Sequence, residues 1–337
     1  MIRLAIGVLT AGVTLTACVS SLSASSSPAS STTTASSAIA ADLDAAYTTV
    51  VKNVSPSVVL IETGSGLGSG EVYDNKGDIV TNAHVVSNAT DFRVTTSTGK
   101  QLPGTLVGSF PPDDIAVIKV NGNGLKPAKF GDSSKLQVGQ IVMAIGNPLG
   151  LQGSVTSGIV SALGRIVSEG RGGGTLPDAI QTSAEINPGN SGGALVDLQS
   201  EVVGIPTLAA LSPVSQNAPA PGIGFAISSN RAKVIADQLV RNGKVTNSRR
   251  AYLGIQVGNA GGQGTLVIAV EPGGPAVKAG ISRGDTITAV DGKPTPTTGE
   301  LAKVLAGLNP GQKVKVDVVR SDGSRATVNL TLGQLPG

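Results

Sequence analysis

Short runs of apolar and β-branched residues dominate the chain between about residues 57 and 227. These runs are SVVLIET, DIVTNAHVV, FRVTT, IAVIKV, IVMAIG, GIVSAL, EVVGI and IGFAI, and Gly, Pro, Asn and Asp separate them. Many short strands with few helices between them are typical of an antiparallel barrel or sandwich. We therefore predict a mostly β first domain over residues 42–246.

The hydrophobic period changes at the end of this region, in SSNRAKVIADQLVRNGK. Four apolar residues fall on one face of a helix, namely Val234, Ile235, Leu239 and Val240. Ser and Asn precede the segment and Gly243 follows it, which is typical of helix ends. We predict that this helix closes the first domain.

A second, smaller unit follows over residues 251–335. Strand-like runs surround a helix-like TTGELAKVLAGL, and they read YLGIQV, TLVIAV, DTITAV, KVKVDVVR and ATVNLTL. Five or six strands and one helix in about 85 residues are enough for a small domain of its own.

The N-terminal segment has a different character. MIRLAIGVLTAGVTLTAC begins with a positive charge and continues as an apolar run, which is typical of a secretory signal. Its end, LTAC, resembles the lipobox of bacterial lipoproteins, so we predict a signal peptide over residues 1–17 and lipidation of Cys18. The alternative is an ordinary secretory signal with a chance cysteine. Residues 18–41 are rich in Ser, Thr and Ala and predict a flexible tether.

Composition and charge exclude several classes of function. The net charge of +3 and the aromatic content of 2% argue against a nucleic-acid partner. Cys18 is the single cysteine and His84 the single histidine, so neither an intrachain disulfide nor a metal site built on these residues is possible. We expect no metal and no cofactor.

The single histidine raises the question of a catalytic base. Two serines are candidate nucleophiles, Ser133 in GDSS and Ser191 in NPGNSGGAL. An α/β-hydrolase places its histidine after its serine, and no histidine follows residue 84. Only the chain order His–Asp–Ser allows an acid between His84 and the serine.

The acid is predicted to be Asp114, in DDIAVIKV. It directly precedes an apolar strand and lies 30 residues after His84, whereas Asp113 is one residue out of phase and is expected to face away. Ser191 lies 77 residues further along, which leaves room for a second barrel. Ser133 follows Asp114 too closely for that, and GDSS is expected to be a surface turn.

The residue types fit acyl-transfer chemistry. A serine hydroxyl becomes nucleophilic when an imidazole takes its proton, and a carboxylate keeps that imidazole in the correct tautomer. The oxyanion that develops needs backbone N–H donors, and the glycines around Ser191 permit the required turn. Gly189 and Ser191 are the expected donors.

Several motifs, in this order, resemble the HtrA/Deg family of trypsin-like proteases. They are GLGSGEVYDNKGDIVTNAHVV, DDIAVIKV, GDSSKLQVGQIVMAIGNPLG, SGIVSALGR and INPGNSGGAL, and YLGIQV with PGGPAVKAGISRGDTITAVDGKP resembles the family's PDZ domain. The resemblance implies a mostly β fold, in which a chymotrypsin-like double β-barrel precedes a small PDZ domain with one or two helices.

The resemblance also implies a function. It implies an ATP-independent serine endopeptidase of the bacterial cell envelope that degrades misfolded or unfolded proteins, here anchored to the membrane through a lipid on Cys18. His84 would be the general base, Asp114 its orienting acid and Ser191 the nucleophile, with Gly189, Asn190 and Ser191 as the oxyanion loop. A homotrimer is the expected assembly, with Tyr47 as its one aromatic anchor.

Binding residues follow from the same resemblance. The pocket for the residue before the cut is expected to contain Glu185, Ile205 and Leu208, and to favour small aliphatic residues; a buried Glu185 selecting basic residues is the alternative. The PDZ peptide site is expected to contain Tyr252, Leu253, Gly254, Ile255, Leu301 and Leu305. For each of these leucines, plain core packing is the alternative.

Two other classes of function compete with the protease. A non-catalytic PDZ adaptor or chaperone-like binding protein could retain a protease scaffold, but the complete triad argues against it. An esterase is disfavoured by the chain order and by the PDZ-like segment. The Gly- and Pro-rich stretches over residues 164–180 and 205–222 are expected to be irregular and mobile.

Overall fold

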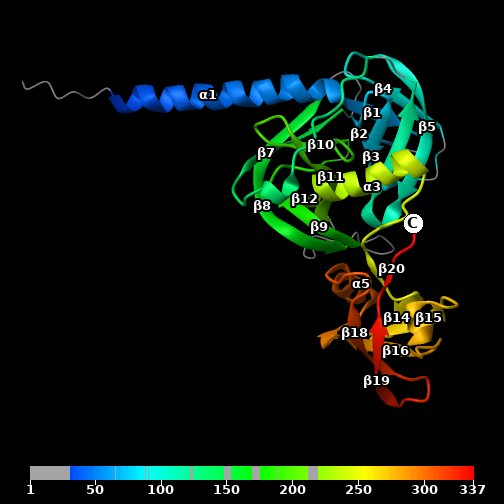
Figure 1. The fold of residues 1–337 in the computed structure, drawn as a ribbon. Coiled ribbons are helices and arrows are strands. Elements are labelled where there is room, and N and C mark those ends of the chain that lie inside the picture. The colour runs from blue at the N-terminus through cyan, green and yellow to red at the C-terminus, as the bar shows by residue number, and fades with distance from the viewer. Residues whose placement is uncertain are drawn as a thin grey trace, which may run out of the picture. The chain divides into compact units, whose positions relative to one another are not determined.

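The computed structural model describes residues 31–64, 66–87, 89, 91–121, 124–147, 153–168, 175–187, 189–211 and 219–337. The chain divides into two compact units, residues 1–44 and 45–337. The larger unit contains two closed β-barrels and a smaller β-rich domain (Figure 1). The predicted fold class is confirmed.

The first helix differs from the sequence-based expectation. α1 spans Ser31–Val54 and so begins inside the segment predicted to be a flexible tether. The abundant alanine favours a helix, and apolar residues recur at helical spacing toward its C-terminal end, where Val50 and Val54 are buried against residues of the second barrel. Ile39 and Leu43, further toward the N-terminus, are 69% and 41% exposed.

The predicted signal peptide and Cys18 lie outside the described residues. Among the helices that the structure does describe, none combines the length and the apolar character needed to cross a membrane.

The first barrel closes in the order β1-β2-β3-β6-β5-β4. Its strands are β1 (Val58–Glu62), β2 (Leu67–Val72), β3 (Asp78–Thr81), β4 (Asp91–Thr95), β5 (Gln101–Phe110) and β6 (Ile115–Val120). The one-turn helix α2, Ala83–Val86, follows β3 directly. Alternate residues of the strands fill the barrel with a cluster of Val, Ile and Leu around Phe92.

The second barrel closes in the order β10-β11-β12-β9-β8-β7. Its strands are β7 (Ile141–Gly146), β8 (Ser154–Ser168), β9 (Thr175–Thr182), β10 (Ala194–Val196), β11 (Val202–Leu211) and β12 (Pro219–Ser228). The expectation of irregular stretches at 164–180 and 205–222 is wrong where the structure describes them. β8 continues to Ser168, β9 begins at Thr175, and β11 continues to Leu211. These segments are strands because pairing with their neighbours satisfies their backbone groups.

The predicted closing helix is confirmed. α3 spans Ser229–Asn242 and ends at Gly243, which adopts the left-handed conformation and donates its N–H to the carbonyl of Leu239 at 2.8 Å. Its buried face joins a cluster that includes Phe110 of the first barrel and Ile205 of the second. The two barrels and α3 therefore share one hydrophobic core.

A carboxylic acid lies within this shared region. On β2, Glu71 is fully buried, and its strand partners Val58 and Val80 belong to the clusters shared with the second barrel. Neither carboxyl oxygen of Glu71 has a hydrogen-bond partner among the described residues. Burial raises the pKa of Glu71 well above its usual value of 4.5.

The small domain is built around a sheet of order β14-β15-β16-β18-β19. Its elements are β13 (Ala251–Tyr252), β14 (Ile255–Asn259), β15 (Thr265–Val270), α4 (Pro275–Lys278), β16 (Thr286–Val290), β17 (Lys293–Pro294), α5 (Thr298–Ala306), β18 (Lys313–Val319), β19 (Arg325–Thr331) and β20 (Gly333–Gln334). The predicted helix is confirmed as α5, whose N-cap Thr297 accepts a hydrogen bond from the N–H of Glu300.

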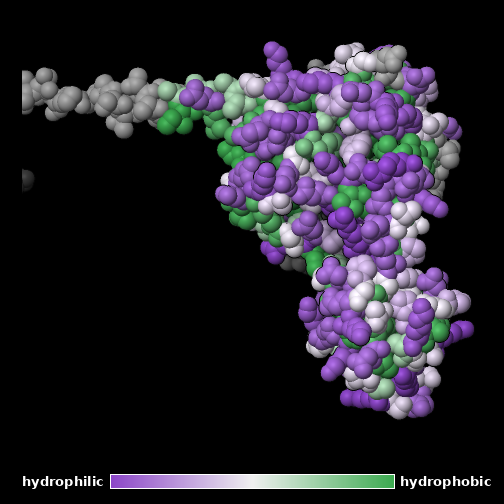
Figure 2. Space-filling view, in the orientation of Figure 1, coloured by the Kyte–Doolittle hydropathy of each residue, from purple (hydrophilic) through white to green (hydrophobic). Residues whose placement is uncertain are grey.

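The visible surface is mainly hydrophilic, with hydrophobic patches on the described part of α1 and on the barrels (Figure 2). The exposed Ile39 and Leu43 account for the apolar character of α1. Tyr47, on the same helix, is partly buried against the second-barrel cluster.

Candidate active site

The structure brings His84 and Asp114 together. His84 lies on α2, directly after β3, and Asp114 follows the 3-10 helix Pro111–Asp113 at the entrance of β6. The Nδ1 atom of His84 is 2.8 Å from Oδ2 of Asp114, and the backbone N–H of His84 donates to Oδ1 at 2.9 Å. Asp114 is 3% exposed, whereas the imidazole is 49% exposed. The carboxylate is thus buried behind a ring that solvent and substrate can reach.

The backbone of Asp114 is itself held in an unusual conformation. Its φ of 52° and ψ of 41° lie in the left-handed region, which non-glycine residues adopt only when their surroundings hold them there. The Nδ2 atom of Asn82 donates to the Asp114 carbonyl at 3.0 Å. This conformation turns the Asp114 carboxylate toward the backbone and ring of His84.

Thr207, which the sequence analysis did not single out, bridges the acid and the nucleophile. Its hydroxyl donates to Oδ2 of Asp114, and its carbonyl accepts from Oγ of Ser191 at 3.4 Å. Thr207 is buried on β11, so it joins residues of the first barrel to the nucleophile of the second. A search for polar residues within the run EVVGIPTLAAL would have found it.

Residues 189–193, which carry Ser191 and are called the nucleophile loop below, form a tight glycine-rich turn. Gly189 has φ 108°, and the N–H of Asn190 donates to the carbonyl of Asn187 at 3.1 Å. The N–H of Gly193 returns to the carbonyl of Asn190 at 3.0 Å. Because the backbone N–H of Asn190 is used within the turn, the backbone N–H groups of Gly189 and Ser191 are the better candidates for oxyanion donors.

Ser69 of the first barrel supports this loop, and the sequence analysis missed its role. Its Oγ donates to the carbonyl of Gly189 at 2.5 Å and accepts from the N–H of Asn147 at 2.8 Å. Its own N–H donates to the carbonyl of Ser191 at 2.9 Å. On the loop itself, Gly192 has φ 79°, and a Cβ there would lie 2.3 Å from the carbonyl oxygen of Ser69, so only glycine lets the loop approach β2 this closely.

The three residues predicted to line the substrate pocket lie in different surroundings. Glu185 is exposed and lines a cavity of about 170 Å³ together with residues that include Asn187, Gly222 and Ile223. Ile205 is fully buried in the core shared by both barrels, so its assignment to the pocket is wrong. Leu208 lies on β11, but its side chain is outside the described residues.

Two further residues of the sequence analysis occupy supporting positions. Ser133 begins a short 3-10 helix and is buried rather than exposed on a surface turn, because its Oγ accepts from the N–H of Asn230 at the start of α3. Asp113 points away from His84, as expected, but it is fully buried and paired with two arginines, Arg231 and Arg250.

In the small domain, two of the six predicted peptide-binding residues belong to the core. Leu253 and Leu301 are 1% and 3% exposed within the domain's hydrophobic cluster, so their assignment to a peptide pocket is wrong. Ile255 and Leu305 pack against that cluster but stay partly accessible. Both leucine corrections follow from size: so small a domain needs its largest apolar side chains for its core.

The loop over residues 252–255 carries an acidic neighbour. Gly254 has φ 73°, and its carbonyl accepts the N–H of Glu271 at 2.9 Å. Oε2 of Glu271 lies 3.5 Å from the position that a Cβ on Gly254 would take. Burial, followed by the hydrogen bond to Glu271, raises the pKa of Tyr252.

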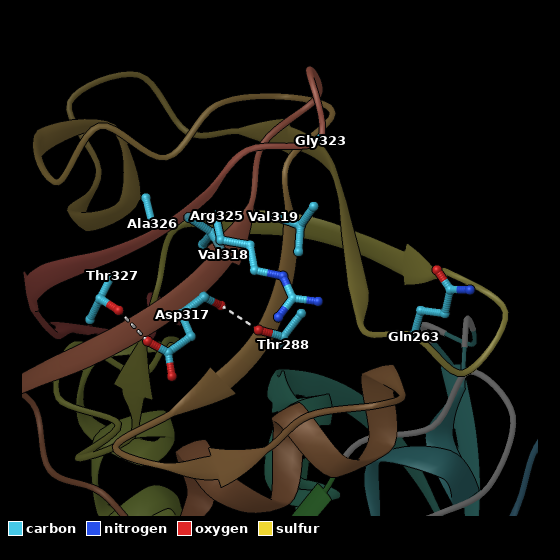
Figure 3. Close-up of a pocket in the computed structure, with 9 residues that line it drawn as sticks. All are labelled: Gln263, Thr288, Asp317, Val318, Val319, Gly323, Arg325, Ala326 and Thr327. Carbon is cyan, nitrogen blue, oxygen red and sulfur yellow. Dashed lines mark hydrogen bonds between the residues drawn. The ribbon is translucent and has the colours of Figure 1, made fainter.

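A hollow of about 780 Å³ lies on the small domain's sheet (Figure 3). Its polar groups bond mainly to one another, since Thr327 donates to Asp317 at 2.6 Å and Thr288 donates to the Asp317 carbonyl at 3.2 Å. The hollow contains neither histidine nor a serine nucleophile. His84, Asp114 and Ser191 therefore remain the candidate catalytic residues.

Two protein families match the chain. Residues 68–205 match the trypsin-like peptidase domain, and residues 251–332 match the PDZ domain. Both assignments agree with the double barrel and the small sheet domain described above.

Curated relatives share about two fifths of their residues with this chain. The serine protease PepD of Mycobacterium tuberculosis is 43% identical over 307 residues, which cover 85% of this chain and 65% of PepD. The periplasmic serine endoprotease DegP of Escherichia coli is 42% identical over 278 residues, which cover 80% of this chain and 57% of DegP. The chain thus spans between half and two thirds of the length of these curated relatives.

Solved structures match over more of their length. A serine endoprotease from Yersinia pestis is 35% identical, with a TM-score of 0.60, over 86% of this chain and 98% of that chain. The HtrA-type protease AlgW with a tripeptide is 33% identical, with a TM-score of 0.61, over 86% of this chain and 98% of that chain.

Proposed function

Because the chain belongs to the HtrA/Deg family, which combines a trypsin-like protease domain with a PDZ domain, we propose that it is an ATP-independent serine endopeptidase acting on misfolded or unfolded proteins. The observation that carries the proposal is the contact of His84 with the buried Asp114, with Thr207 connecting that acid to Ser191. A scaffold that had lost catalysis would have no need to keep this arrangement.

In the proposed mechanism, Oγ of Ser191 attacks the scissile carbonyl while Nε2 of His84 takes its proton. Asp114 holds Nδ1–H, fixes the tautomer and stabilises the imidazolium that forms. The N–H groups of Gly189 and Ser191 stabilise the oxyanion. His84 then gives its proton to the leaving amine, and water reverses the sequence to release the acyl group.

We propose that the enzyme cuts after small aliphatic residues. The cavity beside the nucleophile loop is about 170 Å³ and is lined by glycine, alanine, proline and isoleucine as well as by Glu185 and Asn187. Glu185 is exposed, and an exposed carboxylate gives weak selection for a basic residue because water screens it. Profiling of cleavage sites on an unfolded protein checks this, and dominant cleavage after Lys or Arg would contradict it.

The PDZ domain is proposed to bind extended or C-terminal peptide segments of substrates. The partly accessible residues for this role are Tyr252, Ile255 at the start of β14 and Leu305 on α5, whereas Gly254 is buried. That the HtrA-type AlgW structures contain peptides supports the proposal.

The proposed location is the bacterial cell envelope, outside the cytoplasm, with a lipid on Cys18 as membrane anchor. The LTAC motif and the periplasmic relatives support this. We also propose a homotrimer, supported by the exposed Ile39 and Leu43 on α1. Mass spectrometry of the mature N-terminus and light scattering test the two proposals, and an unmodified N-terminus or a monomer would contradict them.

The experiment that tests the activity is digestion of casein, an unfolded substrate, by the wild type and by Ser191→Ala. We expect cleavage by the wild type and none by the variant. Equal cleavage by both would mean that another nucleophile is responsible. No cleavage by either, with peptide binding retained, would favour the alternative of a non-catalytic PDZ adaptor.

A further inference from the structure

A buried ion cluster lies directly beside the catalytic acid. Asp113, the residue before Asp114, has a side chain that is 1% exposed and is paired with two arginines. Arg250 donates from Nη1 to Oδ1 of Asp113 at 2.9 Å, and Arg231 pairs with Oδ2. The arginine side chains are themselves 12% and 11% exposed. A buried carboxylate needs such partners, because an unpaired charge in this environment is strongly destabilising.

The two arginines come from different segments. Arg231 lies in the first turn of α3, whereas Arg250 lies in the segment between α3 and β13, which joins the protease domain to the PDZ domain. Nη1 of Arg250 also donates to the carbonyl of Pro112. Arg250 therefore holds the backbone carbonyl of Pro112 and the side-chain carboxylate of Asp113, the two residues that precede Asp114.

The joining segment is itself fixed to the end of the PDZ domain. Oγ of Ser248 donates to the carbonyl of Leu335 at 2.6 Å, and the N–H of Leu335 donates to the carbonyl of Arg250 at 2.9 Å. Leu335 also packs against the core shared by the barrels and α3. The place where the PDZ domain begins and the place where it ends thus meet beside the turn that carries Asp114.

That turn depends on its supports. Asp114 adopts a left-handed conformation, and its carboxylate and carbonyl are both used, by His84 and by Asn82. Backbone strain of this kind persists only where neighbouring contacts hold it. A rotation of the peptide at Pro112 or Asp113 would move the carboxylate of Asp114 away from the imidazole.

We propose that Arg250 is a positioning residue of the active site, which acts on Asp114 through Asp113 and Pro112. The inference rests on the proposed proteolytic function and adds that the segment joining the two domains is part of the catalytic support. Loss of Arg250 leaves Asp113 paired with Arg231, so we expect the fold to be retained. The support of the Pro112 carbonyl and of one Asp113 oxygen is lost, and the chemical step slows.

The test compares the mature full-length protein with Arg250→Ala, Arg250→Lys and the matched control Arg249→Gln, which changes the exposed neighbour. We expect Arg250→Ala to lower kcat on a peptide substrate by about tenfold while KM changes little, since misplacements of about 1 Å cost up to roughly a hundredfold. Arg250→Lys should recover most of the rate, because one nitrogen of Arg250 makes both bonds. Arg249→Gln should match the wild type.

A second readout does not depend on activity. His84 is the only histidine, so the low-field NMR signal of its Nδ1 proton needs no assignment among several rings. We expect this signal to shift or broaden in Arg250→Ala and to be unchanged in Arg249→Gln. Melting temperatures, measured in parallel, separate this effect from loss of fold.

The two readouts distinguish failure of this inference from failure of the proposed function. An inactive wild type whose His84 signal nevertheless responds to Arg250→Ala would contradict the proteolytic function and keep the positioning role. An unchanged kcat and an unchanged His84 signal in Arg250→Ala would overturn the inference. A raised KM at constant kcat, or an equal loss in Arg249→Gln, would overturn it as well.

Discussion

Replacement of Glu71 by glutamine should stabilise the protein increasingly as the pH rises. Glu71 is fully buried between the barrels, neither carboxyl oxygen has a hydrogen-bond partner among the described residues, and burial raises its pKa well above 4.5. Between the unfolded and the folded pKa, the folded protein therefore binds one proton that the unfolded chain has released. The stability contributed by this proton is fully present below about pH 4.5 and is lost as the pH rises through the folded pKa.

The size of the effect follows from proton linkage. One proton of difference makes the wild type's free energy of unfolding fall by about 1.4 kcal/mol for each pH unit in this window. Glutamine cannot ionise, so its free energy of unfolding lacks this pH dependence. The free energy of unfolding of Glu71→Gln should therefore exceed that of the wild type by an amount that grows with pH at the same slope. The lost or gained packing of the amide adds an offset that does not depend on pH.

The assay is urea unfolding followed by circular dichroism at several pH values from 4 to 8, with both proteins carrying Ser191→Ala so that they do not digest themselves. Glu62→Gln is the matched control, since it removes a partly exposed carboxyl from the neighbouring strand β1. Parallel curves of stability against pH for the wild type and Glu71→Gln would contradict this prediction, because they would mean that the buried carboxyl is ionised at low cost.

Three further substitutions test contacts of the candidate active site and of the proposed peptide site in the PDZ domain. Thr207→Val should lower kcat by about tenfold, because a hydrogen bond to a charged group contributes roughly 1.5 kcal/mol. Thr207→Ser keeps the hydroxyl and should restore kcat. Equal rates in the wild type and both variants would contradict the bridging role. Ser69→Ala should lower both kcat and the melting temperature, since it leaves the carbonyl of Gly189 without its buried donor; calorimetry and peptide cleavage check this, and an unaltered kcat would contradict the support of the oxyanion loop. Glu271→Gln should tighten the binding of a peptide with a free C-terminal carboxylate by about fivefold, because it removes a negative charge beside Gly254. The binding of the same peptide with an amidated C-terminus should not change. Fluorescence anisotropy measures both affinities, and equal changes for the two peptides would contradict a charge effect.

Much of the fold could be predicted from the sequence, because its pattern is local. Alternation of apolar residues predicts strands, and the change to helical spacing with Gly243 at the end predicts α3, which the structure confirms. The start of α1 could not be predicted in this way, because its first turns carry mostly Ser, Thr and Ala and its buried contacts, at Val50 and Val54, come much later.

The candidate triad could be predicted because a single histidine leaves only one possible chain order. The supporting residues could not, because their roles depend on contacts across the fold. Ser69 reaches Gly189 over 120 positions, and Thr207 reaches Asp114 over 93. The errors at Ile205 and Leu253 have a related cause, since a sequence shows that a residue is apolar but not whether it faces a cleft or a core.

The proposed function requires that His84 activates Ser191 as a nucleophile. Its most direct test is reaction of the folded protein with a fluorophosphonate, followed by mass spectrometry of the labelled peptides. We expect a single adduct on Ser191 in the wild type, and none in His84→Ala although that variant keeps its fold. An adduct on another residue, or equal labelling of Ser191 without His84, would contradict it.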